Sequence, residues 1–383
     1  MKKGSFAGRS CVVLTGATGF LGRELLWKLM GELPPEQDIV CLIRGDSDAV
    51  AEQRLHALLT EASPLPVGAP GRARVHAIAG DISQPRLGLS EAAFAALAVR
   101  TTDIYHGAAT VRFDLPLAEA RRTNVEGTRA MLELAEKARQ AGCLRRFHYI
   151  GTAYVAGGRK GLVLESDHGG VPSFNNTYEE TKCEAEGVVR EHLGAGLPVT
   201  IYRPSIVVGD SKSGYTSSFK VMYWPLKVFA RGLIPIVPAS RASIVDLVPV
   251  DFVVNAIWAL GQREDSVGRC YHLAAGPEHA TSIGEAIDLA AEFFHVYKPL
   301  FVPIATFEKY VRPVLNFVMR GKRRQALETG RVYVPYLNYG ASFDTRNARQ
   351  DLRDSGLAVP DVRDYFETLM RYCVESDWGK RRV

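Results

Sequence analysis

The chain has 383 residues, of which 46% are hydrophobic and 23% are charged, and its formal net charge is +5. This composition is ordinary for one or two globular domains and excludes an intrinsically disordered protein. The small charge excess does not predict nucleic-acid binding, and without a run of about eighteen apolar residues a membrane-spanning helix is not expected.

A strand, a glycine-rich turn and a helix open the pattern. Residues 11–14 (CVVL) predict a strand buried on both faces, and residues 23–30 predict a helix. Between them, Gly16 permits a tight turn, Gly19 lets the backbone approach a pyrophosphate, and Gly22 allows close helix packing. The spacing is G-x-x-G-x-x-G, and its context predicts a dinucleotide site. The predicted contacts are Thr15, Gly16, Thr18, Gly19, Phe20, Leu21, Gly22 and Arg23.

The second strand, predicted over residues 39–43, is followed by Arg44. Enzymes that use NAD usually place an acidic residue here for the ribose hydroxyl, whereas an arginine accommodates the 2′-phosphate of NADP. Arg44 therefore predicts NADPH as the cofactor. Arg23 and Arg54 are weaker candidates for the same phosphate, and Arg44 could instead be an ordinary solvated loop residue.

Two further parallel strands are predicted near residues 75–82 and 103–106. The first ends in Asp81 and Ile82, which could meet the adenine ring, although Asp81 is equally suited to cap the following turn. After the second, the small side chains of Ala108 and Ala109 would let the backbone lie close to the cofactor. His106 is interpreted as a packed core histidine and is left out of the site.

Candidate catalytic groups follow in chain order. Asn124 opens a predicted helix under the sheet, where its amide could also make an ordinary helix-interior hydrogen bond. A strand over residues 146–150 brings the Thr152 hydroxyl to the carboxyl edge of the sheet. Tyr178 and Lys182 are four residues apart, so they share one helix face, and we expect the ammonium to lower the pKa of the phenol from about 10.

Longer segments make these motifs more specific. They are residues 105–114 (YHGAATVRFD), 124–128 (NVEGT), 202–209 (YRPSIVVG) and 246–256 (DLVPVDFVVNA). Together with Tyr178 and Lys182, they resemble the extended short-chain dehydrogenases/reductases. Within that superfamily the chain resembles fatty acyl-CoA reductases and the thioester reductase domains of carrier-protein assembly lines, over about residues 10–275.

The resemblance implies roles for individual residues. Thr152 becomes the catalytic hydroxyl, Tyr178 the acid, Lys182 the lysine that anchors the cofactor, and Asn124 the amide of a water relay. The backbone of residues 204–206 would lie beside the nicotinamide. Gly151 stands where the family usually has serine, which leaves Thr152 as the hydroxyl of that turn. The residues implied beside the nicotinamide are Pro204, Ser205 and Ile206.

The activity implied by the resemblance is NADPH-dependent reduction of a fatty acyl or related thioester, carried on coenzyme A or an acyl carrier protein. Hydride and proton transfer would give an aldehyde, and a second hydride could give the alcohol. The alternative is an NAD(P)-dependent alcohol or sugar-nucleotide dehydrogenase or epimerase of the same fold. A non-enzymatic dinucleotide sensor is disfavoured, because the set of Thr152, Tyr178 and Lys182 is intact.

The predicted fold class is α/β, a Rossmann-type doubly wound parallel sheet with a smaller, mostly helical substrate domain toward the C-terminus. Residues 1–206 and 244–275 are assigned to the NADP-binding domain, and residues 207–243 and 276–383 to the substrate domain. The aromatic stretches 219–226 and 297–302 suit either an acyl-chain tunnel or an ordinary core.

Other features bear on partners and location. Basic clusters at residues 320–324 and 380–382 could meet an acidic carrier protein or the phosphates of coenzyme A, or could be solvated faces. Six scattered cysteines without a C-x-x-C pair predict no metal site and are typical of reduced cytoplasmic proteins. No nucleic-acid partner is expected, and peripheral membrane contact and the oligomeric state stay open.

Overall fold

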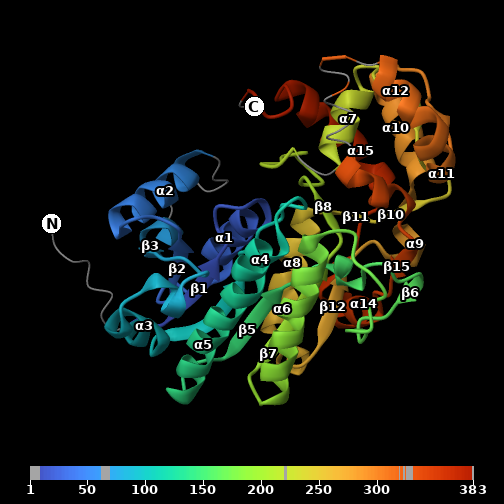
Figure 1. Cartoon of the computed structure of the whole chain (residues 1–383). Coiled ribbons are helices and arrows are strands. Elements are labelled where there is room, and N and C mark those ends of the chain that lie inside the picture. The colour runs from blue at the N-terminus through green and yellow to red at the C-terminus, as the bar shows by residue number, and fades with distance from the viewer. Residues whose placement is uncertain are drawn as a thin grey trace.

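The computed structural model describes residues 9–61, 70–219, 222–318, 320–321, 324 and 331–381. Seven parallel strands form a central sheet in the order β12-β7-β5-β4-β1-β2-β3, with helices on both faces (Figure 1). This arrangement confirms the predicted Rossmann-type fold. The strands are β1 (Cys11–Thr15), β2 (Asp38–Ile43), β3 (Val75–Ala79), β4 (Thr101–His106), β5 (Arg146–Ile150), β7 (Val199–Pro204) and β12 (Cys270–Leu273).

Alternate side chains of the strands enter two separate cores. Val12 and Leu14 of β1 pack with helices α1 and α8, whereas Cys11 and Val13 pack with α3, α5 and α6 on the opposite face. Because a strand projects successive side chains to opposite faces, an unbroken apolar run is what a sheet covered on both sides requires. The covering helices are α1 (Phe20–Glu32), α2 (Asp48–Glu61), α3 (Glu91–Ala98), α4 (Leu117–Arg121), α5 (Gly127–Gln140), α6 (Thr177–Gly194) and α8 (Val250–Gln262).

The order of the strands reverses between β1 and β4. Chain connections leave β1 toward β2 on one side and reach β4 on the other, so a crevice opens at the carboxyl ends of these two strands. Ligands of open α/β sheets bind in such a crevice. The glycine-rich turn after β1 and the loop after β4 both end there, and the site is therefore expected at this edge.

A smaller domain stands over one end of the sheet (Figure 1). Its core contains side chains of α7, α10 and α15, among them the buried Tyr223 and Leu226, so this part of the predicted aromatic stretch is ordinary core. Tyr297 and Leu300 are exposed instead. The elements are β8 (Ile206–Val208), α7 (Tyr223–Phe229), β9 (Ile236–Val237), β10 (Ile244–Val245), β11 (Leu247–Pro249), α9 (Gly276–His279), β13 (Thr281–Ser282), α10 (Ile283–Phe294), β14 (Leu300–Phe301), α11 (Ile304–Thr306), α12 (Arg312–Val318) and α15 (Val362–Glu375).

Residues 341–357 correct the predicted boundary, because they pack on the sheet domain. The strand β15 (Ala341–Phe343) pairs in parallel with β6 (Gly161–Val163). Ala348 and Leu352 of α14 (Arg346–Leu352) lie in the same core as α1 and α8. The chain thus leaves the smaller domain and returns to the sheet before α15.

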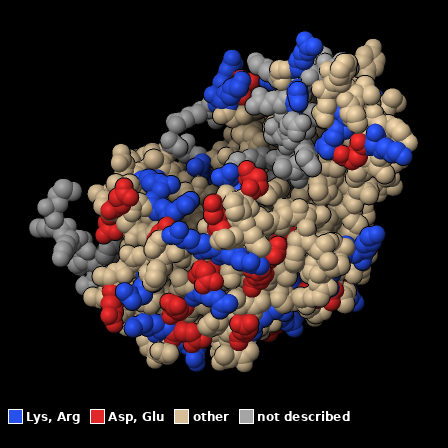
Figure 2. Space-filling view, in the orientation of Figure 1, with Lys and Arg blue, Asp and Glu red and all other residues tan. Residues whose placement is uncertain are grey.

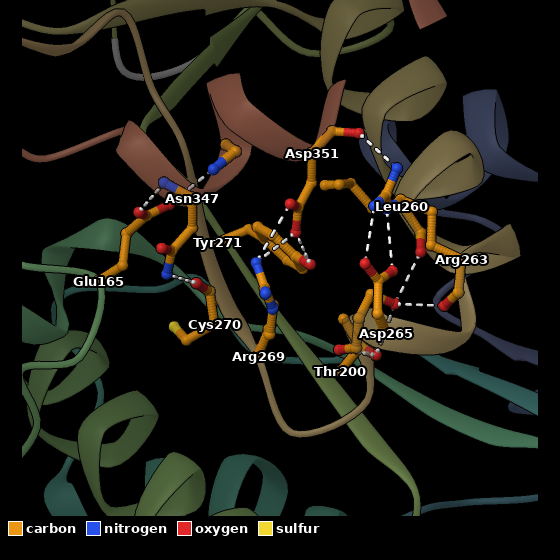
Figure 3. A network of polar contacts seen from close by, with 12 residues as sticks. Glu165, Thr200, Leu260, Arg263, Asp265, Arg269, Cys270, Tyr271, Asn347 and Asp351 are labelled. Carbon is orange, nitrogen blue, oxygen red and sulfur yellow. Dashed lines mark hydrogen bonds and ion pairs between the residues drawn. The ribbon is translucent and has the colours of Figure 1, made fainter. Parts of the chain in front are cut away.

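A polar network holds α14 against β12 (Figure 3). The buried Asp351 carboxylate accepts a 2.6 Å hydrogen bond from the Tyr271 hydroxyl and a 2.8 Å bond from Arg269. Nearby, the buried Glu165 carboxylate accepts bonds from the backbone amides of His272 and Asn347, at 2.9 and 2.7 Å. Buried carboxylates need such partners, which lie far apart in the sequence, and the sequence pattern therefore did not reveal this return.

Among the described residues, no helix combines the length and apolarity needed to cross a bilayer. In the same part of the chain, no group of three His, Cys, Asp or Glu side chains is arranged to hold a metal ion. The six cysteines are free thiols, and five of them are buried.

Candidate active site

The glycine-rich turn has the geometry of a phosphate cradle. Gly16 has φ +82°, the left-handed region that favours glycine, and a Cβ there would lie 2.9 Å from the carbonyl carbon of Gly107. A Cβ at Gly22 would lie 2.1 Å from the Gly16 carbonyl oxygen. A side chain at either position would therefore push apart the turn, the helix and the loop after β4, as the sequence predicts for Gly16 and Gly22.

The first turn of α1 can serve an anion. Gly19 is its N-cap and supplies no side-chain cap, while Thr18 and Gly19 are exposed. Backbone N–H groups in the first turn of a helix have no partner within the helix, and the helix dipole favours negative charge there. The cradle therefore fits the pyrophosphate of a dinucleotide. The amides of residues 20–22 would donate hydrogen bonds to it.

Thr15, a predicted cofactor contact, has a side chain that bonds within the protein. Its hydroxyl is fully buried, lies 2.8 Å from Nδ1 of His106 and accepts a 3.2 Å bond from the Ala108 amide. His106 also lies 3.1 Å from the Thr128 hydroxyl, and burial lowers the pKa of its imidazole to about 3. Thr15 and the neutral His106 thus position the loop of Ala108 and Ala109, and leaving His106 out of the ligand contacts agrees with this geometry.

Three arginines were candidates for the 2′-phosphate, and their positions differ. Arg44 follows β2 directly and is exposed, and the Arg54 guanidinium donates to the Arg44 carbonyl, so both cations stand at the carboxyl end of β2. The Arg23 guanidinium donates instead to the Tyr215 hydroxyl at 3.0 Å. The first two are therefore better placed for a phosphate on the adenosine ribose.

Asp81, which follows β3, caps the next turn. Asp81 Oδ1 accepts bonds from the Ser83 amide and hydroxyl at 2.9 and 2.8 Å, which is the capping alternative. Ile82 is buried in the core of α3 and α5, and a Cβ at Gly127 would lie 2.8 Å from it. Packing against α5 turns the Ile82 side chain inward, and the contact of Asp81 and Ile82 with the adenine ring stays a prediction.

Asn124 lies in a π-helical turn, Arg122–Glu126, and its side chain is fully engaged. Oδ1 accepts a 2.8 Å bond from the Thr110 amide, while Nδ2 donates to the Thr110 carbonyl at 3.2 Å and to the Thr181 hydroxyl at 2.9 Å. The amide therefore ties the loop after β4 to α6. These contacts give the Asn124 side chain a positioning role, and its predicted part in a water relay stays a prediction.

Tyr178 and Thr152 are brought together at the carboxyl edge of the sheet. Thr152 donates a 3.4 Å bond to the Pro204 carbonyl, which sets it between β5 and β7. Burial raises the pKa of the Tyr178 phenol to about 12, while a hydrogen bond with Thr152 opposes this. The expectation of a lowered pKa is wrong here, because burial raises it and the charge of Glu179 acts in the same direction. The phenol stays protonated at neutral pH, as a proton donor must.

The Lys182 side chain is buried. It is 3% exposed, its ammonium donates a 3.0 Å bond to the Ile150 carbonyl, and it lies 4.4 Å from the centre of the Tyr149 ring. Burial lowers the pKa of the ammonium to about 8, against the opposing charge of Glu186. A lysine held this way can switch its charge near neutral pH.

Exchanging this buried charge for an apolar group should stabilise the protein. We expect Lys182→Met to raise the free energy of unfolding at pH 7 by about 1–4 kcal/mol while activity falls. The unfolded lysine has a pKa of about 10.4, above the folded value, so the penalty is complete below about pH 8 and fades as pH rises to 10.4. Urea unfolding at pH 7 and pH 10 measures it, and equal gains at both would contradict this assignment.

Two positioning features were not predicted. Thr181, inside the motif between Tyr178 and Lys182, accepts from Asn124 and donates to the Thr177 carbonyl at 2.7 Å. The buried Asp246 carboxylate accepts from the amides of Ala275 and Gly276 at 2.8 and 2.9 Å, and so holds the chain beside residues 204–206. A polar residue within an otherwise apolar run, as at Asp246, is the signal that could have revealed it.

The chain matches the model of the male sterility protein family, an NAD-binding family, over residues 14–257. This match covers more than half of the chain. The chain belongs to this family. It is an extended short-chain dehydrogenase/reductase of the thioester reductase family, as its motifs predict, and its sheet domain is one that takes a nicotinamide cofactor.

Known proteins support the same family. The terminal R domain of the myxalamid PKS-NRPS biosynthetic pathway is 29% identical and has a TM-score of 0.83, with 98% of this chain and 94% of that chain covered. Nonribosomal peptide synthetase asaC of Aspergillus flavus is 29% identical over 93% of this chain, and fatty acyl-CoA reductase 1 of Rattus norvegicus is 31% identical over 72%. The chain spans 36% and 60% of these two proteins.

Proposed function

We propose that this chain reduces a fatty acyl or related thioester, carried on coenzyme A or a carrier protein, with NADPH as the reductant. The observation that carries this proposal is the Tyr178 phenol, which burial keeps protonated and which is hydrogen-bonded with Thr152, in a sheet domain that also holds a dinucleotide cradle. Relatives described as fatty acyl-CoA reductases and as a terminal R domain support the substrate class.

The chemistry needs two things from the protein. When bound, the reduced nicotinamide supplies a hydride to the thioester carbonyl carbon. Tyr178 and Thr152 donate hydrogen bonds to the carbonyl oxygen as it becomes anionic, and Tyr178 gives it a proton. The resulting hemithioacetal collapses as the C–S bond breaks, releasing the thiol and an aldehyde. Repeating hydride and proton transfer would give the alcohol.

A surface on the smaller domain suits a carrier of acyl groups. Tyr310, Val314 and Phe317 are three or four residues apart along one helical stretch, and all are largely exposed, Phe317 at 87%. Arg320 and Arg324 are exposed close by, although the other basic residues of 320–324 lie outside the described residues. Figure 2 shows Lys and Arg projecting at the top of this domain. Apolar side chains beside cations fit an acidic carrier protein.

The decisive experiment follows NADPH oxidation with acyl-CoA thioesters, acyl carrier proteins and free aldehydes of several chain lengths, with products identified by mass spectrometry. Turnover of thioesters supports the proposal. An aldehyde product indicates one hydride transfer, and an alcohol product indicates two. Turnover of aldehydes alone would favour an alcohol dehydrogenase. Turnover of nucleotide sugars alone would revive the alternative dehydrogenase or epimerase.

The choice of cofactor rests on Arg44 and can be tested separately. Losing a charged hydrogen bond costs about 1.5–3 kcal/mol, so we expect Arg44→Gln to raise the KM for NADPH about 10- to 100-fold and to leave the KM for NADH nearly unchanged. Arg54→Gln tests the neighbouring cation, and Arg23→Gln is the matched control. An unchanged preference in Arg44→Gln would assign the 2′-phosphate to other residues.

A further inference from the structure

An aromatic side chain far along the sequence reaches the acid. The Tyr336 ring, from the 3-10 helix Arg331–Asn338, stacks on the ring of Phe113 with their centres 5.6 Å apart. Phe113 in turn lies 5.9 Å from the Tyr178 ring. Tyr154, two residues after the catalytic Thr152, meets Tyr336 edge-on at 5.3 Å. Tyr336 therefore touches neighbours of both proposed catalytic hydroxyls.

The hydroxyl of Tyr336 is bonded to the residues that flank Tyr178. It donates a 2.6 Å bond to Glu179 Oε1 and accepts a 2.6 Å bond from Asn176 Nδ2. Asn176 is also the N-cap of α6, because its Oδ1 accepts from the Glu179 amide. Tyr336 thus binds the first turn of α6 through residues that precede and follow Tyr178 in the sequence.

The hydrogen bond from Tyr336 matters for stability because Glu179 is buried. Its side chain is fully buried, and an ionised carboxylate without partners in such a place is expensive. In the described part of the chain, its other hydrogen bonds come from Asn175, four residues earlier in the same segment. The bond from Tyr336 is the one that reaches it from a distant element.

We propose that Tyr336 is a positioning residue of the reaction, which clamps its own segment onto the first turn of α6 through Glu179 and Asn176 and seats Phe113 beside Tyr178. The role rests on the proposed function, because the atom being positioned is the Tyr178 phenol oxygen. By covering this side of the acid, Phe113 and Tyr336 fix where a bound acyl group meets the proton donor. A displacement of about 1 Å at such a position can cost about 10²-fold in rate.

The test compares two tyrosines of the same cluster. Tyr336→Phe keeps the ring and removes the clamping hydroxyl, whereas Tyr339→Phe removes a buried hydroxyl that has no hydrogen-bond partner among the described residues. We expect Tyr336→Phe to lower kcat about 10-fold or more with the KM for NADPH within about twofold, and Tyr339→Phe to stay near the wild type. A merely structural defect would instead weaken NADPH binding and kcat together.

A second variant guards against misfolding. Asn176→Ser keeps a good helix N-cap but loses the amide that donates to Tyr336, so it should lower kcat as Tyr336→Phe does. Hydrogen exchange of the amides of residues 177–180 should be faster in Tyr336→Phe than in Tyr339→Phe. This measurement needs no substrate.

The outcomes separate the two proposals. If the wild type turns over no thioester, the proposed function fails, and unchanged hydrogen exchange in Tyr336→Phe would overturn the clamp independently. If thioesters are reduced and Tyr336→Phe matches Tyr339→Phe in kcat, Tyr336 does not position the acid.

Discussion

Tyr178→Phe is expected to lower kcat for thioester reduction by about 10²- to 10⁴-fold, the usual contribution of a positioned general acid. In the proposed mechanism the phenol donates to the carbonyl oxygen, and its pKa of about 12 keeps it protonated across the neutral range. Removing the hydroxyl leaves the cradle of Gly16 and Gly22 untouched, so NADPH should bind as before.

Steady-state kinetics and fluorescence titration with NADPH measure the two effects separately. Tyr105→Phe is a suitable control, because it removes a buried hydroxyl that has no hydrogen-bond partner in the described part of the chain. It should behave like the wild type. Full activity in Tyr178→Phe would rule out this residue as the acid and leave Thr152 as the remaining hydroxyl of the pair.

The largest effect on stability is expected at Arg203. This arginine bonds Glu186, which lies on the helix that carries Tyr178 and Lys182. Both side chains are fully buried, and the two hydrogen bonds between them are 2.9 and 2.6 Å long. The charge of Arg203 holds the pKa of the Glu186 carboxyl well below its usual range, although burial alone would raise it. Arg203→Met leaves that carboxylate without its main partner and should cost about 3–5 kcal/mol.

Urea denaturation of Arg203→Met and of the double variant Glu186→Gln/Arg203→Met measures this cost, and the double variant should recover part of the stability. The folded-state pKa of Glu186 lies below the unfolded value of about 4.3, so its contribution is present above that pH and is lost as pH falls through the folded pKa. The deficit of Arg203→Met should therefore shrink in acid. A loss below about 1 kcal/mol would show that Arg190, which bonds Glu186 at 2.8 Å, suffices.

The local pattern alone located the sheet and the turn that matters most. The strand predicted over residues 146–150 coincides with β5, and those over 39–43 and 103–106 fall within β2 and β4. The glycines at 16 and 22 are predicted from spacing and are required by backbone contacts. Periodicity and turn chemistry suffice here because strands, tight turns and helix starts depend on neighbours in the sequence.

The aromatic content of the smaller domain shows where such patterns end. Tyr223 and Leu226 could have lined a tunnel or filled a core, and the structure places them in the core. Residues 341–357 look like part of the same domain in the sequence, but β15 pairs with β6 and α14 packs in the core of the sheet domain. The pairing of a short strand depends on which distant segment lies beside it, and the spacing of residues in the sequence does not predict that segment.

By itself, the sequence determined the Rossmann-type fold, the phosphate cradle and the set of Thr152, Tyr178 and Lys182. Only the tertiary structure decided their electrostatics: burial raises the pKa of Tyr178 and lowers that of Lys182. It also decided the partners of the Asn124 amide, which are Thr110 and Thr181. The free energy of a charge or an amide depends on what surrounds it in space, and those surroundings come from residues far apart in the chain.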